Sequence, residues 1–310
     1  MTIDGPSESR PSRNQRRDIA REKARQLREE QKKKDRRNRV FLQGGIAVAA
    51  LAIVVLVALV IMNSIRPAGP GPANMASDGI LLTEGMTPVE TPALKPDAEP
   101  VASKPDESGT VADIRMYVDY LCPFCGQFEA TNSEQIGQWV QSGAATVEIH
   151  PISILTSKSA GTQYSLRAAN AAACVANYSP ADFYAFNAAM FADQPEEGTE
   201  GRSDEEIKDI VRASGVTKSL SQIDSCIDEN RYKSWVLSAT DRALTGPLPN
   251  ASIPAVTGTP TVLVNGKQYV GALDDPKEFA SFVLQAAGET YSTATPTPSA
   301  TETPTPAPAG

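Results

Sequence analysis

An uncharged apolar run near the N-terminus divides this chain of 310 residues into two unequal parts. No charged residue occurs from Val40 to Met62. At about 1.5 Å per residue, roughly 20 helical residues cross a hydrocarbon core of about 30 Å. A buried core helix would carry a polar stripe, and a cleaved signal peptide would have a shorter apolar region followed by a small-residue cleavage site. The sequence therefore favours a transmembrane helix at residues 40–62 over both alternatives.

The charges that flank this run are asymmetric. Residues 1–39 hold 14 Lys/Arg and 7 Asp/Glu, a net charge of +7. Because the whole chain has a net charge of −8, residues 40–310 carry −15. Ten Lys/Arg lie in residues 21–40, whereas residues 63–82 contain only Arg66. Because basic flanks stay inside the cell, we expect a basic cytoplasmic tail at 1–39 and an extracytoplasmic location after residue 63. Attraction of this tail to anionic lipids is the alternative to a purely solvated tail.

Composition separates one folded domain from its flanks. Residues 63–110 are rich in Pro, Ala, Gly and Ser and are typical of a linker, with a possible short strand at Ile80–Leu82. At the other end, recurring Thr and Pro without large apolar residues predict a disordered tail at 290–310. The folded domain should span residues 111–289. Its acidic balance argues against nucleic-acid binding, because a phosphate backbone requires a positive surface.

Within this domain the apolar pattern alternates between the period of a strand and that of a helix. A capping box at Ser203–Glu206 marks one helix start, and Asn265-Gly266 suits a type I′ hairpin turn. The predicted elements are a strand at 114–118, a helix from 126, a strand at 145–155, helices over about 158–245, a hairpin at 261–270 and a last helix from 276 to 288. This order predicts an α/β fold with a helical insertion.

Cys122 and Cys125 lie where the first strand meets the first helix, in the sequence Cys-Pro-Phe-Cys. The free N–H groups and the dipole of a helix N-terminus favour an anion, so the pKa of Cys122 should fall below the usual thiol value. Its thiolate would form a mixed disulfide that Cys125 resolves. Pro123 fits the first turn because its missing N–H costs nothing there.

A metal site is the first alternative use of this motif. Tetrahedral zinc needs four ligands, but the remaining candidates, Cys174, Cys226 and His150, are scattered singly along the chain. We therefore expect neither a metal nor a cofactor. A purely structural disulfide between Cys122 and Cys125 is the second alternative. His150 is expected to pack in the domain rather than to catalyse.

Two segments together resemble the DsbA-like branch of the thioredoxin superfamily. They are Asp119-Tyr-Leu-Cys-Pro-Phe-Cys125-Gly and Gly258-Thr-Pro-Thr-Val-Leu-Val-Asn-Gly266. The resemblance covers about residues 111–289 and implies a thioredoxin fold with a helical insertion, here preceded by one transmembrane helix. It further implies that Pro260 is cis and lies against the active-site disulfide, and that Thr259 offers backbone groups to a bound peptide.

Three positions near the motif affect how far the resemblance applies. Phe124 stands where the family often has His, and it cannot donate a hydrogen bond, so thiolate stabilisation should depend on backbone N–H groups. Met116, six positions before Cys122, stands where many members carry a buried acid. For Asp119, a capping or surface role is favoured over a proton relay.

The remaining cysteines, Cys174 and Cys226, lie 52 positions apart in the predicted helical block. Any other partner would have to come from the active site, so a structural disulfide between them is favoured. Closing a loop of that length stabilises a fold by roughly 4 kcal/mol in the chain-entropy model. A second redox pair and two buried free thiols are the alternatives.

The expected function is extracytoplasmic thiol–disulfide oxidoreduction, in the direction of an oxidase. The resemblance implies unfolded secreted or envelope proteins as substrates. It also implies a quinone-linked membrane partner that reoxidises the enzyme. We expect the enzyme itself to be a monomer. A reductase or isomerase is the chemical alternative, although it usually has a dimerisation domain. A redox-inactive peptide-binding domain is the other alternative, but such a domain would need neither cysteine.

Overall fold

The computed structural model describes residues 21–23, 25–29, 31–37, 42–45, 50–55, 69–104 and 110–293. The chain divides into two units, Met1–Pro67 and Ala68–Gly310. In the described part of the first unit, one helix, Arg21–Val55, is long and apolar enough to cross a membrane. Length and composition alone identify it, and an N-terminal signal sequence meets the same criteria. Residues 1–20 of the predicted basic tail and 294–310 of the predicted disordered tail lie outside the described residues.

The described strands of the second unit form one mixed sheet in the order β2-β1-β4-β3-β5-β6. The central strand β3 (Ala112–Val118) pairs in parallel with β4 (Ala145–Pro151) and antiparallel with β5 (Thr261–Val264). The outer strands are β1 (Ile80–Thr83), β2 (Thr87–Pro88) and β6 (Lys267–Gln268). All seven residues of β3 are buried, as expected for the centre of a sheet that is covered on both faces.

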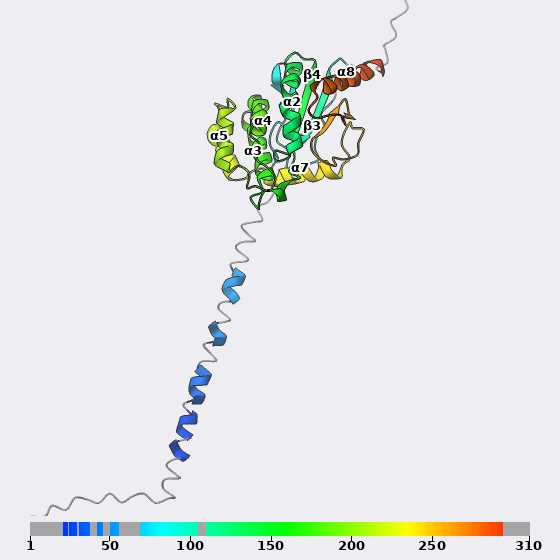
Figure 1. Ribbon diagram of the computed structural model, residues 1–310. Coiled ribbons are helices and arrows are strands. Elements are labelled where there is room, and N and C mark those ends of the chain that lie inside the picture. The colour runs from blue at the N-terminus through cyan, green and yellow to red at the C-terminus, as the bar shows by residue number, and fades with distance from the viewer. Residues whose placement is uncertain are drawn as a thin grey trace, which may run out of the picture. The chain divides into compact units, whose positions relative to one another are not determined.

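Helices α2 (Pro123–Gln141) and α8 (Pro276–Thr293) pack against each other and over β3 and β4 (Figure 1). The rings of Phe128 and Phe279 meet edge to face between them, with centroids 5.1 Å apart. Burying a side chain of this size stabilises a fold by about 1.5–3 kcal/mol. This apolar contact fixes α2, and with it the cysteine motif at the start of α2.

A block of helices separates β4 from β5, where the sequence predicts a helical insertion. A disulfide between Cys174 and Cys226 joins two of these helices, with their Cα atoms 5.9 Å apart. The capping box predicted at Ser203 and Glu206 is present at the start of α5. The helices are α3 (Tyr164–Tyr178), α4 (Phe183–Phe191), α5 (Asp204–Ala213), α6 (Leu220–Asp228) and α7 (Lys233–Thr245).

Much of the segment predicted as a linker is part of the folded unit. Met75 and Ala76 are buried, and the N–H of Val101 donates to the Ala76 carbonyl at 2.8 Å. The cause lies in β1, because Ile80 and Leu82 are buried where this strand pairs with β4. The strand holds the residues around it against the domain, so described residues 69–104 are not a free spacer.

The C-terminal hairpin and helix differ from the sequence prediction in one respect. Asn265 and Gly266 have the positive φ angles, 48° and 76°, that a type I′ turn requires. Helix α8, however, runs through Gly288 to Thr293 rather than ending at the glycine. The Asn265 side chain donates to the Ala286 carbonyl at 3.3 Å and to the Thr290 hydroxyl at 2.9 Å. These contacts hold the helix to the hairpin on both sides of Gly288.

Candidate active site

Cys122 lies between the end of β3 and the first residue of α2. It is the N-cap of that helix, with an extended backbone, and Pro123 occupies the first turn. The N–H groups of Cys125 and Gly126 donate to the Cys122 carbonyl at 3.0 and 3.2 Å. Both cysteines are free thiols in this structure, and both are buried. The structure therefore describes the dithiol form of the pair.

The loop before β5 forms the opposite side of the site. The Thr259-Pro260 peptide bond is cis, and the Cys122 thiol donates to the Thr259 carbonyl at 3.1 Å. Gln194, from the helical block, donates to the carbonyls of Tyr120 and Cys122, each at 2.9 Å. The motif is thus held from two sides by segments that are distant in sequence.

The two thiols are electrostatically unlike. A hydrogen bond from the Cys125 thiol lowers the pKa of Cys122 to about 6, against the opposite effect of burial. The nearby Thr259 side chain, whose buried hydroxyl oxygen has no hydrogen-bond partner among the described residues, and the N–H groups of Cys125 and Phe124 lower this pKa further. Burial raises the pKa of Cys125 well above that of a free thiol. The expectation that backbone N–H groups dominate was incomplete, because side-chain contacts contribute more.

The structure brings together six of the eight residues predicted for the site. Pro123 and Phe124 are exposed at its rim, and 60% of the Phe124 side chain is accessible. Thr259 and Pro260 are half-buried on the facing loop. The other pair, Cys174 and Cys226, is completely buried in the helical block and forms the disulfide described above.

The sequence favoured a capping or surface role for Asp119, and the surface alternative is wrong because Asp119 is fully buried. One carboxylate oxygen accepts from the Leu121 N–H at 2.9 Å. The other accepts from the Leu155 N–H at 2.9 Å and from the Ser165 hydroxyl at 2.7 Å. Burial raises the pKa of Asp119, whereas these hydrogen bonds oppose the rise. The carboxylate joins the loop before Cys122 to the start of the helical block.

A second buried carboxyl group, Glu129, was missed in the sequence. It lies on α2, and its Oε1 accepts from the Asn187 side chain at 2.9 Å. Asn187 in turn accepts from the Tyr120 hydroxyl at 3.0 Å. Burial raises the pKa of Glu129 to about 7, and the hydrogen bond from Asn187 opposes the rise. A sequence signal did exist, because Glu129 follows Cys125 by four positions on the apolar face of the helix.

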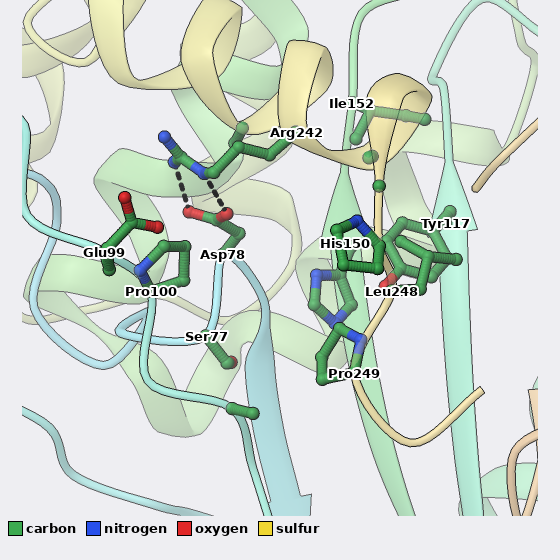
Figure 2. A pocket seen from close by; sticks show the side chains of 15 residues that line it. Ser77, Asp78, Glu99, Pro100, Tyr117, His150, Ile152, Arg242, Leu248 and Pro249 are labelled. Atoms are coloured by element: carbon green, nitrogen blue, oxygen red, sulfur yellow. Dashed lines mark hydrogen bonds and ion pairs between the residues drawn. The ribbon is translucent and has the colours of Figure 1, made fainter. Parts of the chain in front are cut away.

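The opposite face of the sheet carries a separate pocket of about 310 Å³ (Figure 2). Arg242 and Asp78 form an ion pair there with two contacts of 2.7 Å. The His150 ring stacks on Tyr117, with centroids 4.5 Å apart, and its Nε2 lies 3.3 Å from a Glu148 oxygen. His150 packs in the domain, as the sequence predicts. Among the described residues, no group of three or more His, Cys, Asp or Glu could hold a metal ion.

The comparisons with known proteins agree with this geometry. A family model described as thioredoxin matches residues 108–284. Reduced and oxidised crystal structures of DsbA from Mycobacterium tuberculosis are each 28% identical to the chain, with a TM-score of 0.50. Each alignment covers 70% of this chain and 100% of DsbA. The reduced disulfide bond oxidoreductase DsbG of M. tuberculosis is 27% identical over 74% of this chain and 97% of its own, with a TM-score of 0.49. A search of curated proteins found no match.

Proposed function

The chain belongs to the thioredoxin family and is a DsbA-type thiol–disulfide oxidoreductase, and on this premise we propose that it is an extracytoplasmic oxidase acting through Cys122 and Cys125. The difference between the two thiols supports this proposal most strongly. Cys122 has a pKa of about 6 beside a neutral, fully buried Cys125. Cys122 is then the better leaving sulfur in a mixed disulfide with substrate.

The proposed cycle starts from the Cys122–Cys125 disulfide. A substrate thiolate attacks the Cys122 sulfur, the bond to Cys125 breaks, and the Cys125 sulfur keeps the electron pair. A second substrate thiolate then attacks its partner sulfur in the mixed disulfide and releases Cys122 as a thiolate. The substrate has lost two electrons and gained a disulfide, and the enzyme is left as the dithiol that this structure describes.

The lowered pKa of Cys122 favours this direction. Because pH 7 is one unit above the Cys122 pKa of about 6, most Cys122 is ionised in the dithiol form. This ionisation stabilises the dithiol by about 1.4 kcal/mol. For a two-electron couple this corresponds to about 30 mV of higher reduction potential. Cys125 contributes nothing at this pH because it remains protonated in the dithiol form.

Substrates are proposed to be unfolded secreted or envelope proteins. The exposed ring of Phe124 offers an apolar contact next to Cys122, and Thr259 presents its carbonyl on the facing loop. Once a substrate cysteine has formed a mixed disulfide with Cys122, the Cys122 thiol no longer donates to that carbonyl. A backbone N–H of an extended substrate peptide could then donate to it. A membrane partner, of the quinone-linked type, would take the two electrons from the dithiol.

The location is proposed from the first unit. The uncharged apolar run from Val40 to Met62, which overlaps the helix Arg21–Val55, and the excess of Lys/Arg before that run support an anchor with a cytoplasmic N-terminus. The second unit would then lie outside the reducing cytosol, where disulfides persist. The buried Cys174–Cys226 disulfide supports the same compartment.

Mixed-disulfide trapping tests the assignment of the two cysteines. Cys125→Ser should accumulate substrates on Cys122, because the resolving thiol is gone, whereas Cys122→Ser should accumulate none. The complexes can be counted on non-reducing gels after acid quenching and identified by mass spectrometry. Trapping by Cys122→Ser, or by neither variant, would refute the assignment.

A further inference from the structure

Cys125 is the sulfur of the site that has no contact with solvent. Its side chain is fully buried, and burial raises its pKa well above the usual value. When the Cys122–Cys125 bond breaks, the Cys125 sulfur keeps the electron pair and must take up a proton. Before it attacks a mixed disulfide on Cys122, the thiol must lose that proton. Each cycle therefore moves one proton to and from a buried sulfur.

Two buried carboxyl groups flank the motif along the chain, Asp119 before Cys122 and Glu129 after Cys125 on α2. The oxygens of Asp119 accept three hydrogen bonds, from two backbone N–H groups and the Ser165 hydroxyl. A carboxylate engaged in this way is a structural acceptor rather than a free base. At the strand position six before Cys122, Met116 has no ionisable group.

Glu129 has the free oxygen that Asp119 lacks. It follows Cys125 by four positions on α2, so the two Cβ atoms lie roughly 6 Å apart on one helix face. Its Oε1 accepts from Asn187, and no described residue hydrogen-bonds to its Oε2. Because its pKa is about 7, the Glu129 carboxyl group can both give and accept a proton at neutral pH.

A hollow of about 190 Å³ leads from the surface to Glu129. It lies between α2 and α4, which pack side by side (Figure 1). Small residues keep it open, namely Gly126, Ala130, Ala188 and Ala192. A hollow of this size has room for several water molecules. Glu129 is thus buried near the sulfur and in reach of water on the other side.

We propose that Glu129 is the proton-transfer residue for Cys125. Its carboxyl group gives a proton to the sulfur when the disulfide opens, takes it back before Cys125 attacks, and exchanges it with water in the hollow. This inference rests on the proposed function of the cysteine pair. The other titratable groups whose charge couples to Glu129 are Tyr120 and Tyr184, and burial raises the pKa of both. They stay neutral where Glu129 titrates.

The test follows the two sulfur reactions separately in the full-length chain in detergent. Reduced protein is mixed with oxidised glutathione, acid-quenched and weighed by mass spectrometry. Cys122 first attacks glutathione disulfide and releases one glutathione; Cys125 then attacks Cys122 and releases the second. In the wild type, the second step should accelerate with pH around a midpoint near 7. Glu129→Gln should slow it by about 100-fold at pH 7, move the midpoint upward and leave the first step unchanged.

A structural or purely electrostatic role predicts a different result. Removing a negative charge beside Cys125 would lower the pKa of its thiol and speed the second step. Glu134→Gln is the matched control, because Glu134 is exposed on the same helix. Should Glu129→Gln fail to fold, Glu129→Asp can be tested, because it keeps the carboxyl group but moves it further from the Cys125 sulfur. Glu129→Asp should slow the second step while the midpoint of its pH dependence stays near 7.

The possible failures can be told apart. An unchanged or faster second step in a folded Glu129 variant overturns the role of Glu129 and leaves the function of the cysteines intact. A wild type that does not attack glutathione disulfide, or an attack that survives in Cys122→Ser, overturns the proposed function itself.

Discussion

The cysteines of the site share one helical turn but have different surroundings. Cys122 lies at the N-cap, where the Cys125 thiol, the Thr259 side chain and two N–H groups lower its pKa to about 6. Cys125 lies one turn further into the core, where burial raises the pKa of its thiol. Glu129 follows Cys125 by four positions on α2 and is buried as well, so it lies one turn further along the same helix face. One helix end thus provides a reactive sulfur, a protected sulfur and a buried acid.

The buried Glu129 should make stability depend on pH. Its pKa is about 7 in the fold and 4.5 in an exposed chain, so between these values the folded state binds more protons than the unfolded state. Stability from this group is complete below about pH 4.5 and falls as the pH rises through 7, by roughly 3 kcal/mol in total. Urea unfolding at pH 5 and pH 8 should show this loss in the wild type relative to Glu129→Gln. A difference between the two proteins that does not change with pH would contradict it.

At the scale of elements, local signals carried much of the fold. The strand before Cys122, the helix after it, the Ser203 capping box and the Asn265-Gly266 turn depend on neighbouring residues, and the sequence predicted each. The end of α8 depends on a distant contact, because the Asn265 side chain donates to the Thr290 hydroxyl beyond Gly288. Gly288 does not end the helix, since a glycine within a helix costs only about 1 kcal/mol. A local rule therefore placed the end of α8 too early.

The polar contacts inside the site were beyond local rules. Asp119 meets Ser165, which lies 46 positions away, and Glu129 meets Asn187, which lies 58 positions away. Both partners come from the helical block, whose packing against α2 no local pattern specifies. The motif could predict the pair of cysteines and the facing Thr259-Pro260, and helical spacing could have placed Glu129 on the buried face of α2. The hydrogen-bond partners of the two buried acids required the assembled fold.

The disulfide between α3 and α6 should stabilise the helical block without taking part in electron transfer. It is completely buried in the helical block, on elements that do not include the site. Replacing Cys174 and Cys226 together with Ala should cost about 4 kcal/mol, or roughly 10 °C in Tm, while disulfide transfer at Cys122 remains. Calorimetry and the oxidation of a reduced, unfolded protein check the two halves. Loss of transfer in a variant that stays folded would place the pair in the electron path.

At the scale of the whole molecule, the two units are expected to work in different compartments. Described residues 69–104 are packed on the domain, so the folded unit begins well before residue 111, where the sequence placed its start. The folded unit is acidic and the tail is basic, which agrees with opposite sides of a membrane.

Protease treatment of intact cells tests this topology. With one epitope at each end, external protease should remove the C-terminal epitope and spare the N-terminal one, because only the second unit would be accessible. Lysed cells should lose both epitopes, which serves as the control. Protection of the C-terminal epitope in intact cells would reverse the orientation, and a mature protein without the N-terminal epitope would show a cleaved signal peptide.

The reduction potential of the Cys122–Cys125 couple tests the oxidase proposal most directly. The full-length Cys174→Ala/Cys226→Ala variant, which retains only this couple, can be equilibrated in glutathione buffers at pH 7, alkylated and weighed. The oxidase proposal requires a potential above about −200 mV, on the oxidising side of the cytosolic thiol pool, and the Cys122 thiolate contributes about 30 mV in that direction. A value near −270 mV, as reducing as thioredoxin, would contradict the oxidase proposal and favour a reductase.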